Sequence, residues 1–170
     1  MTKKILLAVF CLLTLTVTAQ EQKFGYFNLS EIFNSMPETA VAFAKLDTLT
    51  KGYETELSKM QQEYQKKGSE FVASRDSLPE SIRTRRMTEI QDLENRLQEF
   101  YQFSQKDLQT QRTQLITPIN EKLVKAVKSV GQENGFTYIF DISANSGLMY
   151  WSTEKCVDAT NLIRSKLNLK

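Results

Sequence analysis

The sequence predicts a mainly α-helical protein with a small β body, an α+β fold in which a long antiparallel coiled-coil hairpin projects from a short-stranded sheet. Three observations lead to this prediction. Apolar residues recur every three or four positions over two long stretches, one strong turn signal separates these stretches, and short aromatic segments lie outside them. We expect the hairpin arm from residues 37–130 and the body from 20–36 and 131–170.

The first residues predict a secretory signal peptide, residues 1–19. Lys3 and Lys4 precede an apolar run from Ile5 to Val17, and Ala19 is the small residue that signal peptidase requires. The apolar run is too short to span a bilayer comfortably. We therefore expect cleavage after Ala19 and export of the mature chain.

The composition argues against catalysis, cofactors and nucleic-acid binding. The chain has 22 basic and 20 acidic residues, and removal of Lys3 and Lys4 brings the mature charge to about zero, which gives no support to nucleic-acid binding. The absence of histidine removes the commonest general base and the usual zinc ligand, and no phosphate-binding glycine loop occurs. We expect no enzyme activity, no cofactor and no metal.

Two polar residues of the body could carry chemistry, and structural roles are favoured for both. Asp141 lies in an otherwise apolar strand, where a capping or interface hydrogen bond explains an isolated acid as well as a shifted pKa does. Cys156 is the one cysteine of the expected mature chain. A partly buried packing role is favoured over an intermolecular disulfide.

The body is expected to begin with a short aromatic strand from Lys23 to Leu29, followed by a short helical turn at 30–33. The segment Met36-Pro37-Glu38 then starts the first long helix. Proline is favoured in the first helical turn, and glutamate is favoured near the positive end of the helix dipole.

Two apolar stripes with the same period predict the helical hairpin. The first stripe contains Leu46, Leu49, Tyr53, Leu57, Met60, Tyr64, Gly68 and Phe71. The second contains Ile90, Leu93, Leu97, Tyr101, Ser104, Leu108, Arg112, Leu115, Ile119, Leu123, Ala126 and Val130. Each stripe alone would be exposed to water, so the two helices are expected to fold back on each other with a tip near residues 76–80. At Pro118 we expect simple curvature of the second helix, with a hinge as the alternative.

The second helix is expected to end at Gly131, with a buried strand at 136–142 and a second strand at 148–151 that together form a β-hairpin. Asp158 is expected to cap a last helix, whose inward residues are Leu162, Ile163 and Leu167. So much chain in the arm leaves too little for a sizeable monomeric core, so oligomerisation is expected.

Two groups of arm residues are candidates for binding. Around the tip, basic residues outnumber the acids Glu70, Asp76 and Glu80, which indicates either a solvated face or attraction to acidic partners or membrane headgroups. The basic residues are Lys66, Lys67, Arg75, Arg83, Arg85 and Arg86. Beside the stripes lie Val72, Phe100 and Phe103, which either broaden the core or form an exposed apolar ledge for client contact.

The order and spacing of these features resemble the Skp/OmpH family. The resemblance rests on the signal peptide, Gly25-Tyr26-Phe27-Asn28, Met36-Pro37-Glu38, the two long helices, the segment 135–141 and Val157-Asp158-Ala159-Thr160. It implies an ATP-independent periplasmic holdase chaperone that keeps unfolded outer-membrane β-barrel proteins from aggregating by binding them between helical arms.

The resemblance also implies a homotrimer assembled through the body. The body residues assigned to that contact are Phe24, Tyr26, Tyr138, Phe140, Tyr150 and Trp151. The mature chain is nearly neutral, unlike the basic members of the family, so apolar contacts are expected to contribute more than charge to client binding. The alternative function is an envelope coiled-coil adaptor that grips one folded partner, and a transient contact of the tip with a membrane surface stays open.

Overall fold

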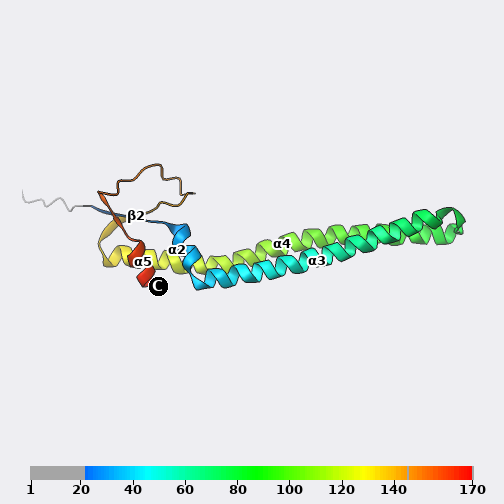
Figure 1. Ribbon diagram of the computed structural model, residues 1–170, viewed down its shortest axis with the longest axis horizontal. Helices are drawn as coiled ribbons and strands as arrows, with labels where there is room; N and C mark the ends of the chain where they lie inside the picture. The colour runs from blue at the N-terminus through cyan, green and yellow to red at the C-terminus, as the bar shows by residue number, and fades with distance from the viewer. Residues whose placement is uncertain (1–21, 145, 170) are drawn as a thin grey trace, which may run out of the picture.

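The computed structural model describes residues 22–144 and 146–169, so the predicted signal peptide lies outside the described residues. The elements are β1 (Lys23–Phe27), α2 (Leu29–Ser35), α3 (Pro37–Ser74), the 3-10 turn η1 (Arg75–Ser77), α4 (Glu80–Glu133), β2 (Phe136–Asp141), β3 (Cys156–Asp158) and α5 (Thr160–Lys166). A small body lies at one end of the molecule, and α3 and α4 extend from it side by side as a long arm (Figure 1). The predicted fold class, a helical hairpin on a small sheet, is confirmed.

The two arm helices begin where local chemistry favours a helix start. Pro37 occupies the first turn of α3, and Pro79 caps the start of α4 after η1 has reversed the chain. The chain reverses at residues 75–79, which overlap the tip predicted near residues 76–80. Helix α4 is 54 residues long and runs through Pro118 into the body, ending three residues beyond Val130. Pro118 therefore does not break the helix.

The core lies where the root of the arm meets the body. It is formed by Phe27, Ile32, Met36, Ala42, Ile119, Leu123, Ala126, Val130, Ala159, Ile163 and Leu167. Farther along the arm, the buried residues of α4 are Leu93 and Ser104, and the α3 stripe from Leu46 to Phe71 is half-buried throughout. A pair of helices covers only a narrow seam, so part of each stripe stays in contact with water.

Two members of the predicted second stripe lie outside this seam. Tyr101 is 53% exposed and Arg112 is also exposed, whereas Ser104 between them is buried. The prediction that all twelve positions face α3 was wrong at these two, because a single partner helix cannot cover the full width of a stripe with this period.

The sheet has the strand order β2-β1-β3, and both pairings are parallel. The predicted hairpin of 136–142 with 148–151 is therefore wrong: residues 148–151 form no strand, and β3 lies at Cys156–Asp158. A parallel neighbour cannot be reached through a tight turn, so the segment after β2 crosses to the other side of β1 before β3 begins. The apolar residues at 148–151 belong to this crossover.

Polar caps join the body elements. The Asp141 carboxylate accepts hydrogen bonds from the Leu29 backbone N–H at 3.1 Å, where α2 starts, and from the Ser143 backbone N–H at 2.8 Å. Asp141 therefore has the capping role favoured from the sequence. At the other end, Asp158 accepts from the Thr160 backbone N–H, but the N-cap of α5 is Ala159, one residue after the predicted cap. Leu162 of α5 is 38% exposed, so its predicted inward position was wrong.

Candidate functional site

Three aromatic rings from both arm helices form a cluster midway along the arm. Tyr53 of α3 packs edge-to-face against Phe100 and Phe103 of α4, with ring centroids 5.8 and 6.2 Å apart. The two phenylalanine rings lie 6.2 Å from each other. Phe103 is 56% exposed and projects from the arm, whereas Phe100 is half-buried against Tyr53.

Tyr53 is fixed by a hydrogen bond that the sequence analysis missed. Its hydroxyl donates to the Asp107 carboxylate across the two helices, with an oxygen–oxygen distance of 2.7 Å. This hydrogen bond, with smaller contributions from desolvation and from the negative charge of Asp107, raises the pKa of Tyr53 above the ordinary tyrosine value. The sequence signal was weak, because Asp107 is one of many acids on the arm helices.

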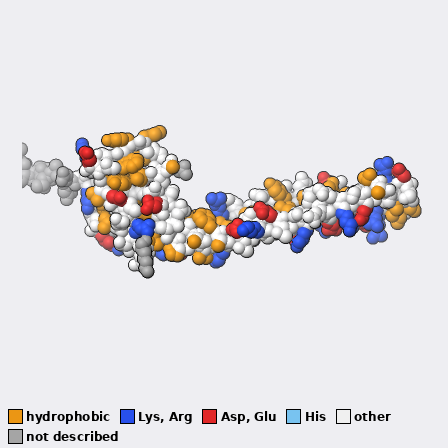
Figure 2. Space-filling view, viewed as in Figure 1, with side chains coloured by type: hydrophobic (Ala, Val, Ile, Leu, Met, Phe, Trp, Pro, Cys, Tyr) orange, Lys and Arg blue, Asp and Glu red, His pale blue; other side chains and the backbone are white. Residues whose placement is uncertain are grey.

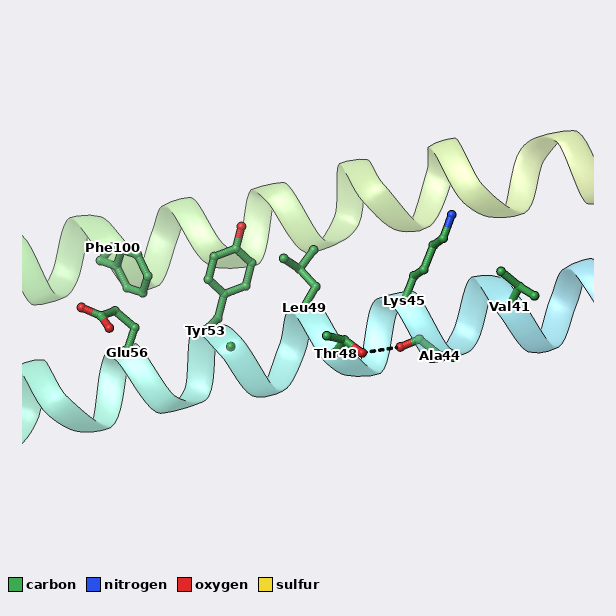
Figure 3. Close-up of a pocket in the computed structure, with 9 residues that line it drawn as sticks. Val41, Ala44, Lys45, Thr48, Leu49, Tyr53, Glu56 and Phe100 are labelled. Carbon is green, nitrogen blue, oxygen red and sulfur yellow. Dashed lines mark hydrogen bonds between the residues drawn. The ribbon is translucent and has the colours of Figure 1, made fainter.

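An open apolar groove of about 780 Å³ begins at this cluster and follows α3 toward the body (Figure 3). It is lined by Val41, Ala44, Lys45, Thr48, Leu49, Gly52, Tyr53, Glu56 and Phe100. Thr48 donates its hydroxyl to the Ala44 carbonyl at 2.9 Å, so the polar group of this side chain is already bonded within α3. The lining between Lys45 and Glu56 is therefore mainly apolar.

Gly52 lines the groove without contributing a side chain. A Cβ atom built at Gly52 meets no heavy atom within 4 Å, so the packing of this chain does not require glycine there. Glycine inside a helix costs about 1 kcal/mol relative to alanine. The same is true of Gly68, which does not line the groove.

The apolar surface continues toward the root of the arm. A second groove of about 570 Å³ shares Val41 and Lys45 with the first and reaches Leu115 and Pro118 of α4. Val41 is 55% exposed at the junction. One continuous apolar face therefore extends from the aromatic cluster to the start of α3.

The structure does not bring Val72 to this face. Val72 lies 19 residues beyond Tyr53 on α3, about 30 Å along the helix axis at 1.5 Å per residue. It is 77% exposed and lies near the tip, where Ile82 and Met87 are also exposed. The three residues predicted for client contact thus belong to two separate apolar areas.

The basic tip is more nearly balanced than the sequence analysis assumed. Glu89 was not counted among the acids of the tip. Its carboxylate forms ion pairs with Arg85 at 3.1 Å, Arg86 at 3.2 Å and Lys67 at 4.0 Å. The spacing of Glu89 from Arg85 and Arg86, four and three residues along one helix, could have indicated these pairs.

The other basic residues of the tip also lie among acids. Arg75 pairs with Asp76 at 3.2 Å and Arg83 with Glu80 at 3.4 Å, while Lys66 is exposed. Blue, red and orange side chains alternate at this end of the arm (Figure 2). Exposed pairs of this kind contribute about 0–1 kcal/mol each. With Glu89 counted, the six basic residues lie among four acids, so the tip carries only a mild excess of positive charge.

The body presents a second aromatic surface. Phe24, Tyr138 and Phe140 stack on the outer face of β1 and β2, with ring centroids 5.9 to 6.3 Å apart. Beside them, Trp151 of the crossover lies 6.1 Å from Tyr26. Parallel sheets are usually covered on both faces, and this face is covered only in part.

The crossover adds exposed apolar side chains to this surface. Tyr150 is 79% exposed and Met149 is 96% exposed. The Nε1 atom of Trp151 is buried but has no hydrogen-bond partner among the described residues. Five of the six residues assigned to the body contact thus form two aromatic groups around β1, and Tyr150 projects next to them.

Neither a metal-binding group nor a membrane-spanning helix occurs among the described residues. Residues 22–144 and 146–169 contain no group of histidine, cysteine and acidic side chains that could hold a metal ion. Within the same ranges, no helix combines the length and apolar character needed to cross a bilayer. Cys156 is a half-buried free thiol in β3.

Comparisons with known proteins agree with this architecture. The family model "Outer membrane protein (OmpH-like)" matches residues 23–167. The chaperone protein Skp of Yersinia enterocolitica is 27% identical over 136 residues, which cover 78% of this chain and 80% of that protein. A crystal structure described as an outer membrane chaperone (OmpH-like) from Caulobacter crescentus CB15 has a TM-score of 0.71 at 15% identity, covering 86% of this chain and 84% of that one.

Proposed function

The chain belongs to the OmpH/Skp family of chaperones, and we propose that it is an ATP-independent periplasmic holdase for unfolded outer-membrane β-barrel proteins. The observation that carries this proposal is the apolar face of the arm, from the aromatic cluster along the groove to Val41. An exposed apolar face of this extent is typical of a binding surface.

The geometry supports loose rather than specific binding. The groove is open and continuous, and its lining offers apolar side chains and a helix backbone at Gly52 instead of a ring of fixed polar partners. Such a surface accepts many apolar segments, each with a small gain in free energy. A client held by many weak contacts is kept from aggregating and is released without ATP.

Assembly through the body would bring several arms together around one client. We infer that residues 20–36 and 131–170 form the oligomerisation region of a homotrimer and that residues 37–130 form the arm that encloses the client. The partly covered aromatic face of β1 and β2 and the unpaired outer edges of β2 and β3 support this inference, because a three-stranded sheet with open edges is marginal alone.

The tip has a lesser role in this proposal. Its residual positive charge and the exposed Val72, Ile82 and Met87 fit a transient contact with a membrane surface during client transfer. The pairing of Arg85 and Arg86 with Glu89 lowers the electrostatic contribution to such a contact.

The test is light scattering of the mature protein, alone and after a urea-unfolded outer-membrane barrel has been diluted into it. A trimer that holds the barrel in a discrete soluble complex is the expected result. Aggregation of the barrel at every chaperone ratio would refute the holdase. Recognition of one folded envelope protein, without protection of the barrel, would replace it with the adaptor function.

A further inference from the structure

We propose that Tyr53 is a positioning residue for client binding, because its hydrogen bond to Asp107 holds the aromatic cluster in the shape that receives an apolar client segment. The inference rests on the proposed holdase function and assigns a role within it. Tyr53 is the ring shared by the two parts of the surface: it lines the groove with Phe100 and also contacts the exposed Phe103.

The Tyr53 ring packs against both of its neighbours at steep angles. Its plane lies at 71° to Phe100 and at 89° to Phe103, whereas the two phenylalanines lie at 37° to each other. Edge-to-face packing depends on these angles, since the positive edge of one ring must point at the negative face of the next. A swing of the Tyr53 side chain about its Cα–Cβ bond would carry the ring out of both contacts together.

The hydrogen bond opposes that swing. The hydroxyl oxygen lies on the axis of the Cβ–Cγ bond, so its bond to Asp107 fixes where the ring lies, whereas packing alone would hold the side chain loosely at a half-exposed position. The 2.7 Å contact with Asp107 joins the far end of the ring to the other helix. Figure 3 shows Tyr53 directed from α3 toward α4, with Phe100 beside it at the head of the groove.

Loss of the hydrogen bond would leave the surface correctly shaped only part of the time. The apparent affinity for a client is proportional to the fraction of molecules in the competent arrangement. The loss of one hydrogen bond shifts the equilibrium between the competent and incompetent arrangements by about fivefold. A client would then bind up to about fivefold more weakly to a protein whose arm is still folded.

The experiment compares Tyr53→Phe, Asp107→Leu and Asp107→Asn in the full mature protein. Each variant is titrated with the urea-unfolded barrel for its dissociation constant, and its melting temperature is recorded. We expect measurably weaker binding, by up to about fivefold, for Tyr53→Phe and Asp107→Leu, since both lose the bond. Asp107→Asn should bind like the original protein, because the amide oxygen still accepts the hydroxyl proton.

Tyr64→Phe is the matched control. Tyr64 lies eleven residues after Tyr53, at the same position of the apolar repeat, and is also half-buried. No side-chain hydrogen bond of Tyr64 occurs among the residues that the structure describes. Its phenylalanine variant should therefore bind clients with unchanged affinity.

Two results would overturn the inference, and they differ from failure of the holdase itself. If Tyr53→Phe lowers the melting temperature but leaves the dissociation constant unchanged, the hydrogen bond is merely structural. If Phe103→Ser weakens client binding while Tyr53→Phe does not, the ledge binds clients without needing Tyr53. If the original protein does not bind the barrel, the proposed function fails first.

Discussion

Gly25 of β1 lies against the ring of Phe136 so closely that a Cβ atom at this position would stand 2.9 Å from a ring carbon. The ring has little freedom to retreat, because the Lys23 ammonium lies 4.3 Å from its centre on one side and Ile139 packs nearby. Gly25 is the central residue of β1 and pairs with Ile139 of β2, so the contact lies between the two strands.

Gly25→Ala should therefore destabilise the body. We expect a loss of about 1–3 kcal/mol in the free energy of unfolding, the usual cost of forcing extra volume into a packed site. Urea denaturation followed by circular dichroism measures it. The double variant Gly25→Ala, Phe136→Leu should recover part of the loss, since a smaller side chain leaves room for the methyl group. Equal stability of Gly25→Ala and the original protein would contradict the close packing.

Gly52→Ala should separate stability from binding. Alanine at this helical position should add up to about 1 kcal/mol of stability, and its methyl group would enter the groove without striking the chain itself. We expect a higher melting temperature and weaker binding of the unfolded barrel. Gly68→Ala is the control, with the same gain in stability and unchanged binding. Equal affinity of the two variants would remove the groove from the contact surface.

The raised pKa of Tyr53 predicts a loss of stability in alkaline solution. The neutral phenol donates to Asp107, and its ionisation would place two negative charges together. Because the folded pKa lies above the unfolded value of 10.0, this stabilisation is complete below that pH and is lost as pH rises through the folded pKa.

Tyrosinate absorbance during an alkaline titration measures this shift. Subtracting the Tyr53→Phe titration from that of the original protein isolates Tyr53, which should ionise at higher pH than a free tyrosine. In Asp107→Leu the pKa of Tyr53 should fall back toward 10.0. A pKa of Tyr53 that is the same in the original protein and in Asp107→Leu would be inconsistent with the hydrogen bond.

An acid-sensitive ion pair between Glu38 and Lys122 joins α3 to α4 at the root of the arm. The Lys122 ammonium donates to Glu38, and this hydrogen bond lowers the pKa of Glu38 below its ordinary value of 4.5. The resulting stability is present above the unfolded pKa and is lost as pH falls through the folded pKa. Lys122→Met should therefore lower the melting temperature at neutral pH but have little effect in strong acid. A difference that is constant with pH would indicate lost packing instead.

The aromatic face of the body should control the molecular mass. Tyr138 is the most exposed ring of the stack formed with Phe24 and Phe140, so Tyr138→Ser removes apolar area where a second copy is proposed to pack. We expect light scattering to show a smaller species at low protein concentration. Leu162→Ser, an exposed change on α5 away from the sheet, should keep the original mass. An unchanged trimer in Tyr138→Ser would place the interface elsewhere.

Periodicity and turn signals predicted what depends on local sequence. The helix start at Pro37, the two apolar stripes and the final helix near Asp158 follow from neighbouring residues, and the structure has each of them. Contacts between distant residues were not accessible in this way. The Tyr53–Asp107 bond joins positions 54 residues apart. Tyr101 looked like a seam residue because the stripe alone does not show where the partner helix lies.

The placement of β3 depended on contacts between distant residues, whereas the ion pairs of the tip could have been predicted from local spacing. Residues 148–151 have the composition of a strand, but β3 forms at Cys156–Asp158 because the crossover must first pass β1. At the tip, Glu89 could have been counted with Arg85 and Arg86, since all three belong to one helix. The role of Phe100 and Phe103 in client contact stays a prediction.

The central position of β1 has a consequence for the order in which the chain folds. This strand leads the described chain, yet both of its partners follow α4, and the hydrogen bond from Lys23 to the Asn134 carbonyl spans 111 positions. The hairpin of α3 and α4 can form from nearer contacts as soon as both helices are available, whereas the sheet must wait for the C-terminal segments. A chain that folds as it emerges N-terminus first would therefore have its arm before its body, and β1 would wait without strand partners until the C-terminal segments arrive.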